Sequence, residues 1–192
     1  MNKQNVISFF DKHASSWDEM NFHNDSVIKQ ILDFACVKKD VSLLDVACGT
    51  GVLFDEYIKR GVVDFTAIDI SPEMVKKARS KYVDKNILCG DAEEYSFGKL
   101  FDCIVVFNAF PHFVDPHKLL ENLSSQLQTG GRLTISHGAS REAIIKCHSG
   151  DALNISNILP TAEALAELMG EYVLVDIVIS DVEKYVVSGY KK

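Results

Sequence analysis

The chain has 192 residues, of which 47% are hydrophobic and 24% are charged, and its formal charge is −7 at pH 7. These values are typical of a single globular domain with a sizeable core. The negative charge argues against broad binding to nucleic acid or to an anionic membrane. No apolar run of the sequence approaches the length that spans a bilayer.

The cysteines are scattered along the chain and form no Cys-x-x-Cys pair. The N-terminus is polar and then amphipathic, which is not the pattern of a signal peptide. Cys48 and Cys103 fall in segments that are expected to be buried. These observations predict reduced thiols in a cytoplasmic protein.

Residues 2–24 form an amphipathic segment whose apolar side carries several aromatic residues. Residues 25–37 have apolar residues at helical spacing, and Asp25 or Ser26 is the expected N-cap. We expect this second helix to cover one face of a sheet. The predicted organisation is therefore a helical cover over residues 1–38 and a core over residues 39–192, within one domain.

The next stretch carries the strongest motif of the chain. Residues 41–46 read as a buried parallel strand, and the segment Gly49-Thr50-Gly51 leads into a helix over residues 52–60. A strand that turns through glycines into a helix places backbone N–H groups beside one pocket. Phe54 occupies the position of the third glycine of a dinucleotide fingerprint. With Asp45 late in the strand, this pattern suits a ligand with an ammonium group and no pyrophosphate.

Acidic residues follow the next two predicted strands. Residues 62–70 form the second strand, which ends in Asp69, 18 positions after Gly51. This spacing is close to the ~20 residues expected for a carboxylate that binds ribose hydroxyls. Ser71-Pro72 then begins a helix. Residues 86–90 form a short third strand, and Asp91 follows it.

The fourth strand, over residues 101–107, is apolar enough to be buried on both faces, and it ends at Asn108. A helix is predicted over residues 119–128, closed by Thr129-Gly130-Gly131. The fifth strand, over residues 132–136, leads into His137. We expect short helices over residues 141–147 and 161–169. Residues 172–179 and 182–190 alternate in hydrophobicity as a final pair of strands.

These motifs follow one another in a familiar order over residues 41–138, about half of the chain. Together they resemble the class I S-adenosylmethionine-dependent methyltransferases, in which an acidic residue precedes a glycine-rich turn. Ala47 stands where that family often has its first glycine. Residues 108–113 match the fourth motif of the family. The run Phe9–Asp18 resembles the segment that folds over cofactor and substrate in small methyltransferases of the ubiquinone-biosynthesis type.

The resemblance implies an α/β fold with a Rossmann-like, seven-stranded, mostly parallel sheet, helices on both faces and a C-terminal antiparallel hairpin. It also implies the roles of several residues. The cofactor-binding set is Asp45, Ala47, Gly49, Gly51, Asp69, Ile70, Met74, Asp91, Ala92 and Asn108. In this set Asp45 and the glycines hold the methionine portion, Asp69 holds the ribose, and Asp91 and Ala92 hold the adenine between Ile70 and Met74.

Three histidines are expected near the acceptor. His112 and His137 follow neighbouring strands, and His148 lies one short helix further on. They could supply a general base, donors that orient the substrate, or ligands for a divalent metal such as zinc. Their spacing matches no standard metal motif. The catalytic candidates are His112, His137 and Asn108, and the three histidines form the candidate metal set.

The predicted function is methyl transfer to a small molecule by an enzyme that acts as a monomer or a homodimer. A non-catalytic protein that binds adenosylmethionine or a metal on the same fold remains the alternative. Phe54 disfavours a nicotinamide-dependent oxidoreductase.

Overall fold

A computed structural model of the chain describes residues 1–20, 23–147 and 154–192. Its centre is a seven-stranded sheet with the order β3-β2-β1-β4-β5-β7-β6. Every paired strand runs parallel to its neighbour except β7, which is antiparallel to both β5 and β6. The strands are β1 (Leu43–Val46), β2 (Phe65–Asp69), β3 (Asn86–Cys89), β4 (Phe101–Phe107), β5 (Leu127–His137), β6 (Leu174–Ser180) and β7 (Tyr185–Tyr190). The predicted fold is confirmed, with the last strand of the hairpin inside the sheet.

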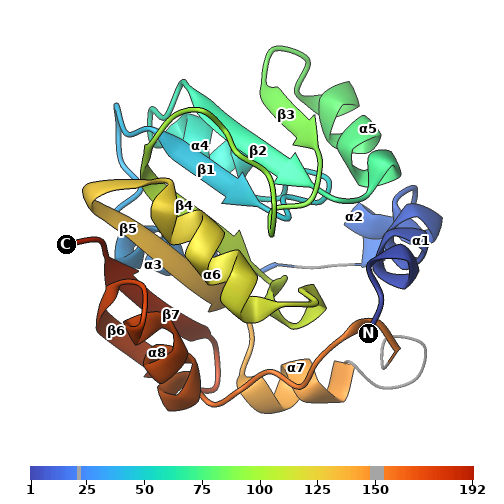
Figure 1. The fold of residues 1–192 in the computed structure, drawn as a ribbon. Coiled ribbons are helices and arrows are strands. Elements are labelled where there is room, and N and C mark those ends of the chain that lie inside the picture. The colour runs from blue at the N-terminus through green and yellow to red at the C-terminus, as the bar shows by residue number, and fades with distance from the viewer. Residues whose placement is uncertain (21–22, 148–153) are drawn as a thin grey trace.

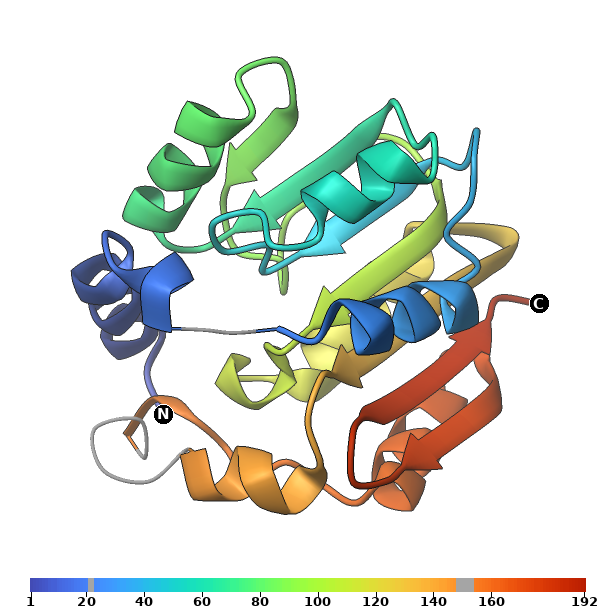
Figure 2. The same ribbon diagram turned by 180° about the vertical axis from the view of Figure 1, so that it is seen from behind.

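Helices cover both faces of this sheet, as Figures 1 and 2 show from opposite sides. The helices α3, α4 and α5 lie on one face, and α6 and α8 lie on the other. The helices are α1 (Lys3–His13), α2 (Trp17–Met20), α3 (Asp25–Phe34), α4 (Phe54–Lys59), α5 (Pro72–Lys81), α6 (Pro116–Ser125), α7 (Arg141–Cys147) and α8 (Ala162–Gly170), with a 3₁₀ turn η1 (Phe110–His112).

The central strands are apolar because they face helices on both sides. Successive side chains of a strand point to opposite faces. In β1, Leu44 and Val46 belong to the core beneath α6 and α8, whereas Leu43 belongs to the core beneath α3 and α4. The remaining side chain of this strand, Asp45, is also buried, with 2% of its surface exposed. A carboxyl group at such a position calls for a specific explanation.

The predicted bounds of one helix and one strand are wrong. The helix expected at residues 119–128 begins at Pro116, because the Asp115 side chain accepts a hydrogen bond from the backbone N–H of Lys118 at 3.0 Å. It ends at Ser125, because Leu127 already pairs with Phe101 in the sheet. The glycines that were expected to close the helix therefore lie inside β5.

The N-cap of α3 also differs from the prediction. Asn24, rather than Asp25 or Ser26, caps the helix, since its side chain accepts a hydrogen bond from the N–H of Ser26 at 3.0 Å. The helix buries Val27, Ile28, Ile31 and Leu32 against the sheet, so it covers one face as expected.

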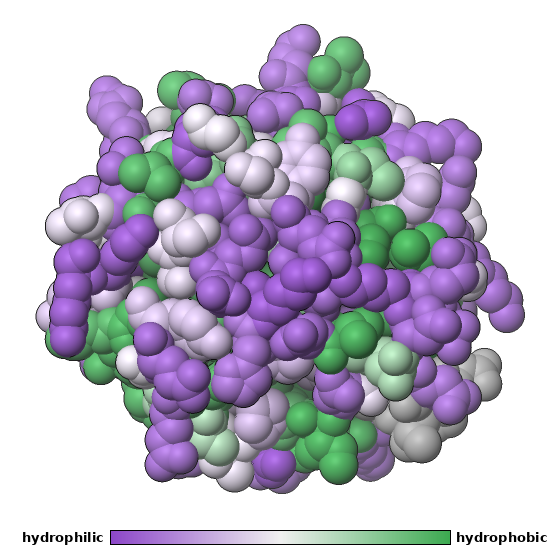
Figure 3. All heavy atoms as spheres, in the orientation of Figure 1, coloured by the Kyte–Doolittle hydropathy of each residue, from purple (hydrophilic) through white to green (hydrophobic). Residues whose placement is uncertain are grey.

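The surface in Figure 3 is mainly hydrophilic, and its apolar residues form small, separate groups. In the described ranges, no helix has both the length and the apolar character needed to cross a membrane. The helices α1 and α2 sit beyond the carboxyl ends of the central strands (Figures 1 and 2).

Candidate functional site

A pocket with a cavity volume of about 530 Å³ opens at the carboxyl ends of β1, β2 and β4. In open α/β sheets, ligands bind at this edge, where the strand order reverses. The turn after β1, the end of β2, residues 90–93, the segment after β4, the end of β5 and the helices α1, α2 and α7 all contribute to its walls. The structure therefore brings most of the predicted site residues into one cavity.

The turn after β1 adopts an unusual backbone conformation. Ala47, Gly49 and Gly51 have φ values of 55°, 55° and 88°, in the left-handed region. The N–H of Cys48 donates to the carbonyl oxygen of Ile68 at 3.1 Å, which ties the turn to the end of β2. Glycine reaches this region without strain, whereas alanine does not. The turn thus exposes backbone to the pocket at Ala47, Cys48 and Gly49.

The two glycines of this turn are needed for different reasons. A Cβ added at Gly51 would lie 2.7 and 2.9 Å from ring carbons of the buried Phe54. Among the described residues, a Cβ added at Gly49 would meet the Nε1 atom of Trp17 at 4.0 Å and no other atom within 4 Å. Gly49 therefore leaves room for a ligand against the backbone, while Gly51 allows α4 to pack closely on the turn.

Alanine substitutions separate these roles. We expect Gly51→Ala to lower the free energy of unfolding by about 2–4 kcal/mol, because overpacking adds to the left-handed backbone cost. Gly49→Ala should cost about 1 kcal/mol, from the backbone alone. Urea unfolding of both variants measures the difference. Equal losses in the two variants would contradict the packing role of Gly51.

Asp69 ends β2 and faces the glycine turn. One carboxylate oxygen accepts from the N–H of Gly49 at 2.7 Å, and the other accepts from the N–H of Ser71 at 2.9 Å. Burial raises the pKa of Asp69 to about 6, although these backbone hydrogen bonds partly oppose the rise. Asp69 lines the pocket, and so do Ile70 and Met74 beside it.

Asp91 follows β3 and binds the N-terminal helix. The ammonium group of Lys3 lies 2.5 Å from Asp91 and 2.7 Å from Glu93. Burial lowers the pKa of Lys3, but its hydrogen bonds to both carboxylates outweigh burial and raise that pKa. Glu93 is 2% exposed, and it also accepts from the backbone N–H groups of Val114 and Asp115 at 2.7 and 3.0 Å. Ala92 and both acids line the pocket.

Asp45 lies apart from the other predicted site residues. It is fully buried below the glycine turn and is not among the described residues that line the pocket. Burial raises the pKa of Asp45 to about 8, the nearby Tyr57 hydroxyl partly offsets this rise, and the charge of Asp69 adds to it. Any influence of Asp45 on a ligand must therefore act through the turn above it.

Asn108 and His112 follow β4. Asn108 has a φ of 54°, and its side-chain oxygen accepts from the N–H of Gly138 at 2.9 Å, which joins the ends of β4 and β5. The Nδ1 atom of His112 lies 3.0 Å from the carbonyl oxygen of Ile155 and 3.1 Å from the Ser156 hydroxyl. Because a carbonyl only accepts, the hydrogen of a neutral His112 ring is on Nδ1, and Nε2 carries the lone pair.

His137 ends β5 beside β4, as expected, and lines the same pocket. It is 2% exposed and packs edge-on to Tyr185 with ring centroids 5.9 Å apart. His148, the third member of the expected zinc set, lies outside the described residues. Within residues 1–20, 23–147 and 154–192, no three His, Cys, Asp or Glu side chains form a group that could hold a metal. The described part of the chain therefore gives the zinc site no support.

The helices α1 and α2 lie against the pocket through polar contacts of Lys3, Asp11 and Asp18. Besides the ion pairs of Lys3, Asp11 accepts from the Ser71 hydroxyl at 2.5 Å, at the N-terminus of α5. Asp18 accepts from the hydroxyl of Thr50 in the glycine turn and pairs with Lys81 at 3.0 Å. These contacts hold the first helices over the cavity.

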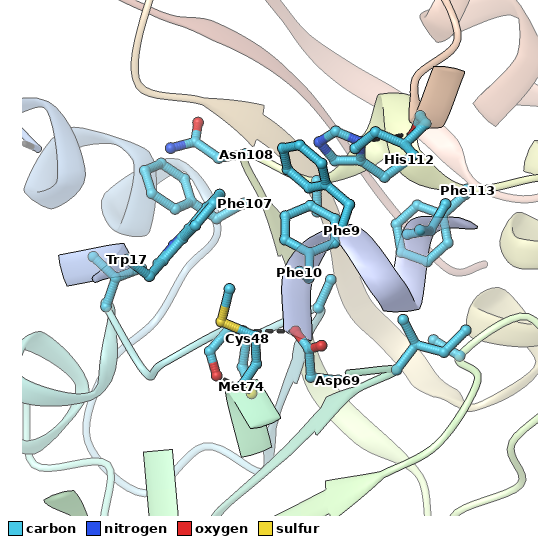
Figure 4. Close-up of a pocket in the computed structure, with 18 of the residues that line it drawn as sticks. Phe9, Phe10, Trp17, Cys48, Asp69, Met74, Phe107, Asn108, His112 and Phe113 are labelled. Atoms are coloured by element: carbon cyan, nitrogen blue, oxygen red, sulfur yellow. Dashed lines mark hydrogen bonds between the residues drawn. The ribbon is translucent and has the colours of Figure 1, made fainter. Parts of the chain in front are cut away.

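Aromatic rings line much of the remaining wall. Figure 4 shows Phe9, Phe10, Trp17, Phe107 and Phe113 around the space between His112 and Asp69. Phe10 packs edge-on to the rings of His112 and Trp17, with its centroid 5.0 Å from that of His112 and 5.4 Å from that of Trp17. The cavity is thus polar on the side of β2 and β3, and apolar beside η1.

Several of these residues could not be chosen from the sequence alone. Lys3 precedes Asp91 by 88 positions, so no local pattern connects the two. Ile155 and Ser156 reach His112 from a segment without motif character. Glu93 did carry a signal, because it lies within the acidic run Asp91-Ala92-Glu93-Glu94 that follows a predicted strand.

Comparison with known proteins places these features in context. A family model described as "Methyltransferase domain" matches residues 44–135. A malonyl-[acyl-carrier protein] O-methyltransferase of Priestia megaterium is 28% identical over 158 residues, which cover 78% of this chain and 57% of the relative. A demethylmenaquinone methyltransferase of Paenarthrobacter aurescens is 33% identical over 141 residues, 68% of this chain and 54% of the relative. The chain spans about half the length of these curated relatives.

Solved structures share the fold over nearly the whole chain. The N-methyltransferase NodS of Bradyrhizobium japonicum, in complex with S-adenosyl-L-homocysteine, superposes with a TM-score of 0.75 and covers 97% of this chain and 98% of its own. Its sequence identity is 15%, so the likeness concerns the fold.

Proposed function

Because the chain belongs to the class I S-adenosylmethionine-dependent methyltransferases, we propose that it transfers a methyl group from S-adenosylmethionine to a small-molecule acceptor. The observation that carries this proposal is the position of Asp69, which lies beside the N–H of Gly49 in a cavity that also contains Asn108 and His112. When bound, the cofactor supplies an electrophilic methyl group on a sulfonium.

The residues present fit such a cofactor. The open space above Gly49 suits a ligand that approaches the backbone closely. The turn over Gly49 and Gly51 holds the methionine portion, and the ammonium group of this portion favours the ionised form of Asp45 below the turn. Asp69 accepts hydrogen bonds from the ribose hydroxyls. Asp91 and Ala92 hold the adenine between Ile70 and Met74.

The acceptor binds on the other side of the cavity. Asn108 fixes the ends of β4 and β5 and faces the methyl group together with His112. His112 and His137 line this side and take the proton of the acceptor or orient it. The protein contributes mainly by holding the acceptor in line with the methyl group in a site that excludes water.

The helices α1 and α2 act as a cover that must open to admit both ligands. The contacts at Lys3, Asp11 and Asp18 close it. All five cysteines of the chain are free thiols, which suits a reducing compartment such as the cytoplasm.

Titration with S-adenosylhomocysteine tests the first step. Trp17 is the single tryptophan of the chain and lines the pocket, so its fluorescence should change when the nucleoside binds. Calorimetry should give a stoichiometry of one. Transfer of an isotopically labelled methyl group to small molecules then tests catalysis. Failure to bind would contradict the proposal, and tight binding without transfer to any acceptor would favour a non-catalytic binding protein.

A further inference from the structure

The charges around the pocket are unevenly distributed. Among the described residues that line it, the charged ones are Lys3, Asp69, Asp91 and Glu93. All four lie on the side that we assign to the cofactor. The acceptor side, from Phe107 to Val114 and from His137 to Ala139 together with part of α7, contributes no charged side chain among the described lining residues.

The permanent cation of this pocket is already paired. Lys3 lies 2.5 Å from Asp91 and 2.7 Å from Glu93, so its charge is compensated twice. Arg141, at the start of α7, donates to the carbonyl oxygens of Leu159 and Pro160 at 2.9 and 3.0 Å and does not line the pocket. The residues outside the described ranges, 21–22 and 148–153, include neither lysine nor arginine in their sequence.

An anionic acceptor would therefore be buried without a lysine or arginine partner. Burial of an unpaired carboxylate costs several kcal/mol. The walls offer aromatic faces instead, from Phe10, Phe107 and Phe113. His23, which also lines the pocket, has its pKa lowered by burial, so this ring is held neutral.

We infer that the acceptor is an uncharged, largely apolar small molecule. This inference rests on the proposed function. The nucleophilic atom forms a bond to the methyl carbon while the carbon–sulfur bond breaks and leaves its electron pair on sulfur. A proton carried by the nucleophilic atom passes to solvent. The relative from Priestia megaterium, by contrast, is named for a malonyl group, which carries a carboxylate.

A matched pair of ligands tests the charge requirement. The protein is first titrated with S-adenosylhomocysteine and then, when saturated, with 2-naphthol or with 2-naphthoate, which share one ring system. We expect 2-naphthol to bind at least about tenfold more tightly at pH 7.5, measured by calorimetry, because the carboxylate is ionised at this pH.

An added cation provides the second arm. Ala143 is an exposed residue of α7 that lines the pocket, and Ala164 is an exposed residue of α8 that does not. We expect Ala143→Arg to tighten the binding of 2-naphthoate at least about fivefold, and Ala164→Arg to leave it unchanged. Binding of 2-naphthoate as tight as that of 2-naphthol, binding of neither ligand, or no effect of Ala143→Arg would overturn the inference while the cofactor site stands. A protein that does not bind S-adenosylhomocysteine overturns the proposed function and this inference together.

Discussion

We expect the Asp69→Ala variant to bind S-adenosylhomocysteine about 100-fold more weakly than the parent protein, or worse. The carboxylate that we assign to the ribose lies in the pocket with 8% of its surface exposed. Hydrogen bonds to a charged group contribute about 1.5–3 kcal/mol each, and two such bonds correspond to a factor of this size. Removal of the carboxylate also takes away the acceptor for the N–H of Gly49, which donates to Asp69 at 2.7 Å in the glycine turn. Calorimetric titration measures the affinity.

A control for this variant lies at the other end of the same strand. Asp64 is exposed and directly precedes β2, so Asp64→Ala changes the same charge at the edge far from the cavity. It should bind as the parent does. Circular dichroism confirms that both variants are folded before titration. If the Asp69→Ala variant binds with the affinity of the parent, the assignment of Asp69 to the ribose is wrong.

The affinity should also depend on pH through the same group. Because burial raises the pKa of Asp69 to about 6, its carboxyl takes up a proton as the pH falls through 6. A protonated carboxyl loses acceptor strength toward the ribose hydroxyls. The parent protein should therefore bind S-adenosylhomocysteine less tightly at pH 5 than at pH 7. The affinity of the Asp69→Ala variant should not show this difference between the two pH values.

The fold and most of the cofactor side could be predicted because their signals are local. Strand, glycine turn and helix follow one another over residues 43–59, and Asp69 and Asp91 each end or follow a strand. Parallel strands bring their carboxyl ends to one edge, so short motifs far apart in sequence meet without further information. For the same reason the presence of His112 and His137 in one pocket could be anticipated from the order of β4 and β5.

The remaining features depend on contacts that no local pattern encodes. The ion pairs of Lys3 join the first helix to a loop 88 positions away. The tautomer of His112 depends on a carbonyl oxygen 43 positions later. The helix α6 begins at Pro116 because Asp115 caps it, while the apolar pattern used for the prediction starts only at Leu119. The absence of cations on the acceptor side of the described pocket became visible only once the walls were known.

The second large effect is expected at Asp45, where a substitution should raise the free energy of unfolding instead of lowering it. Burial raises the pKa of Asp45 from an ordinary 3.8 to about 8, so the folded state favours the protonated carboxyl. The stability that this group contributes is fully present below pH 3.8 and is lost as the pH rises through about 8. One pKa unit corresponds to about 1.4 kcal/mol, so ionisation of Asp45 lowers the free energy of unfolding by several kcal/mol at high pH.

We therefore expect Asp45→Asn, which keeps the shape and stays neutral, to raise the free energy of unfolding of the ligand-free protein by about 3 kcal/mol at pH 9. At pH 4 the variant and the parent should be nearly equal, because the parent carboxyl is then protonated. Urea unfolding at both pH values measures the difference. The exposed Asp64→Asn serves as the matched control and should change neither value.

The same variant tests what the buried charge contributes to binding. If the ionised carboxylate of Asp45 favours the ammonium group of the cofactor through the turn above it, Asp45→Asn should bind S-adenosylhomocysteine more weakly than the parent at pH 9, where the parent carboxyl is ionised, although the fold of the variant is more stable. Replacement of a purely structural residue would change stability and affinity in the same direction. A gain in stability with a loss in affinity is typical of a group that is kept for function at a cost in stability. Unchanged affinity beside higher stability would limit Asp45 to the core, and lower stability at pH 9 would contradict the burial argument itself.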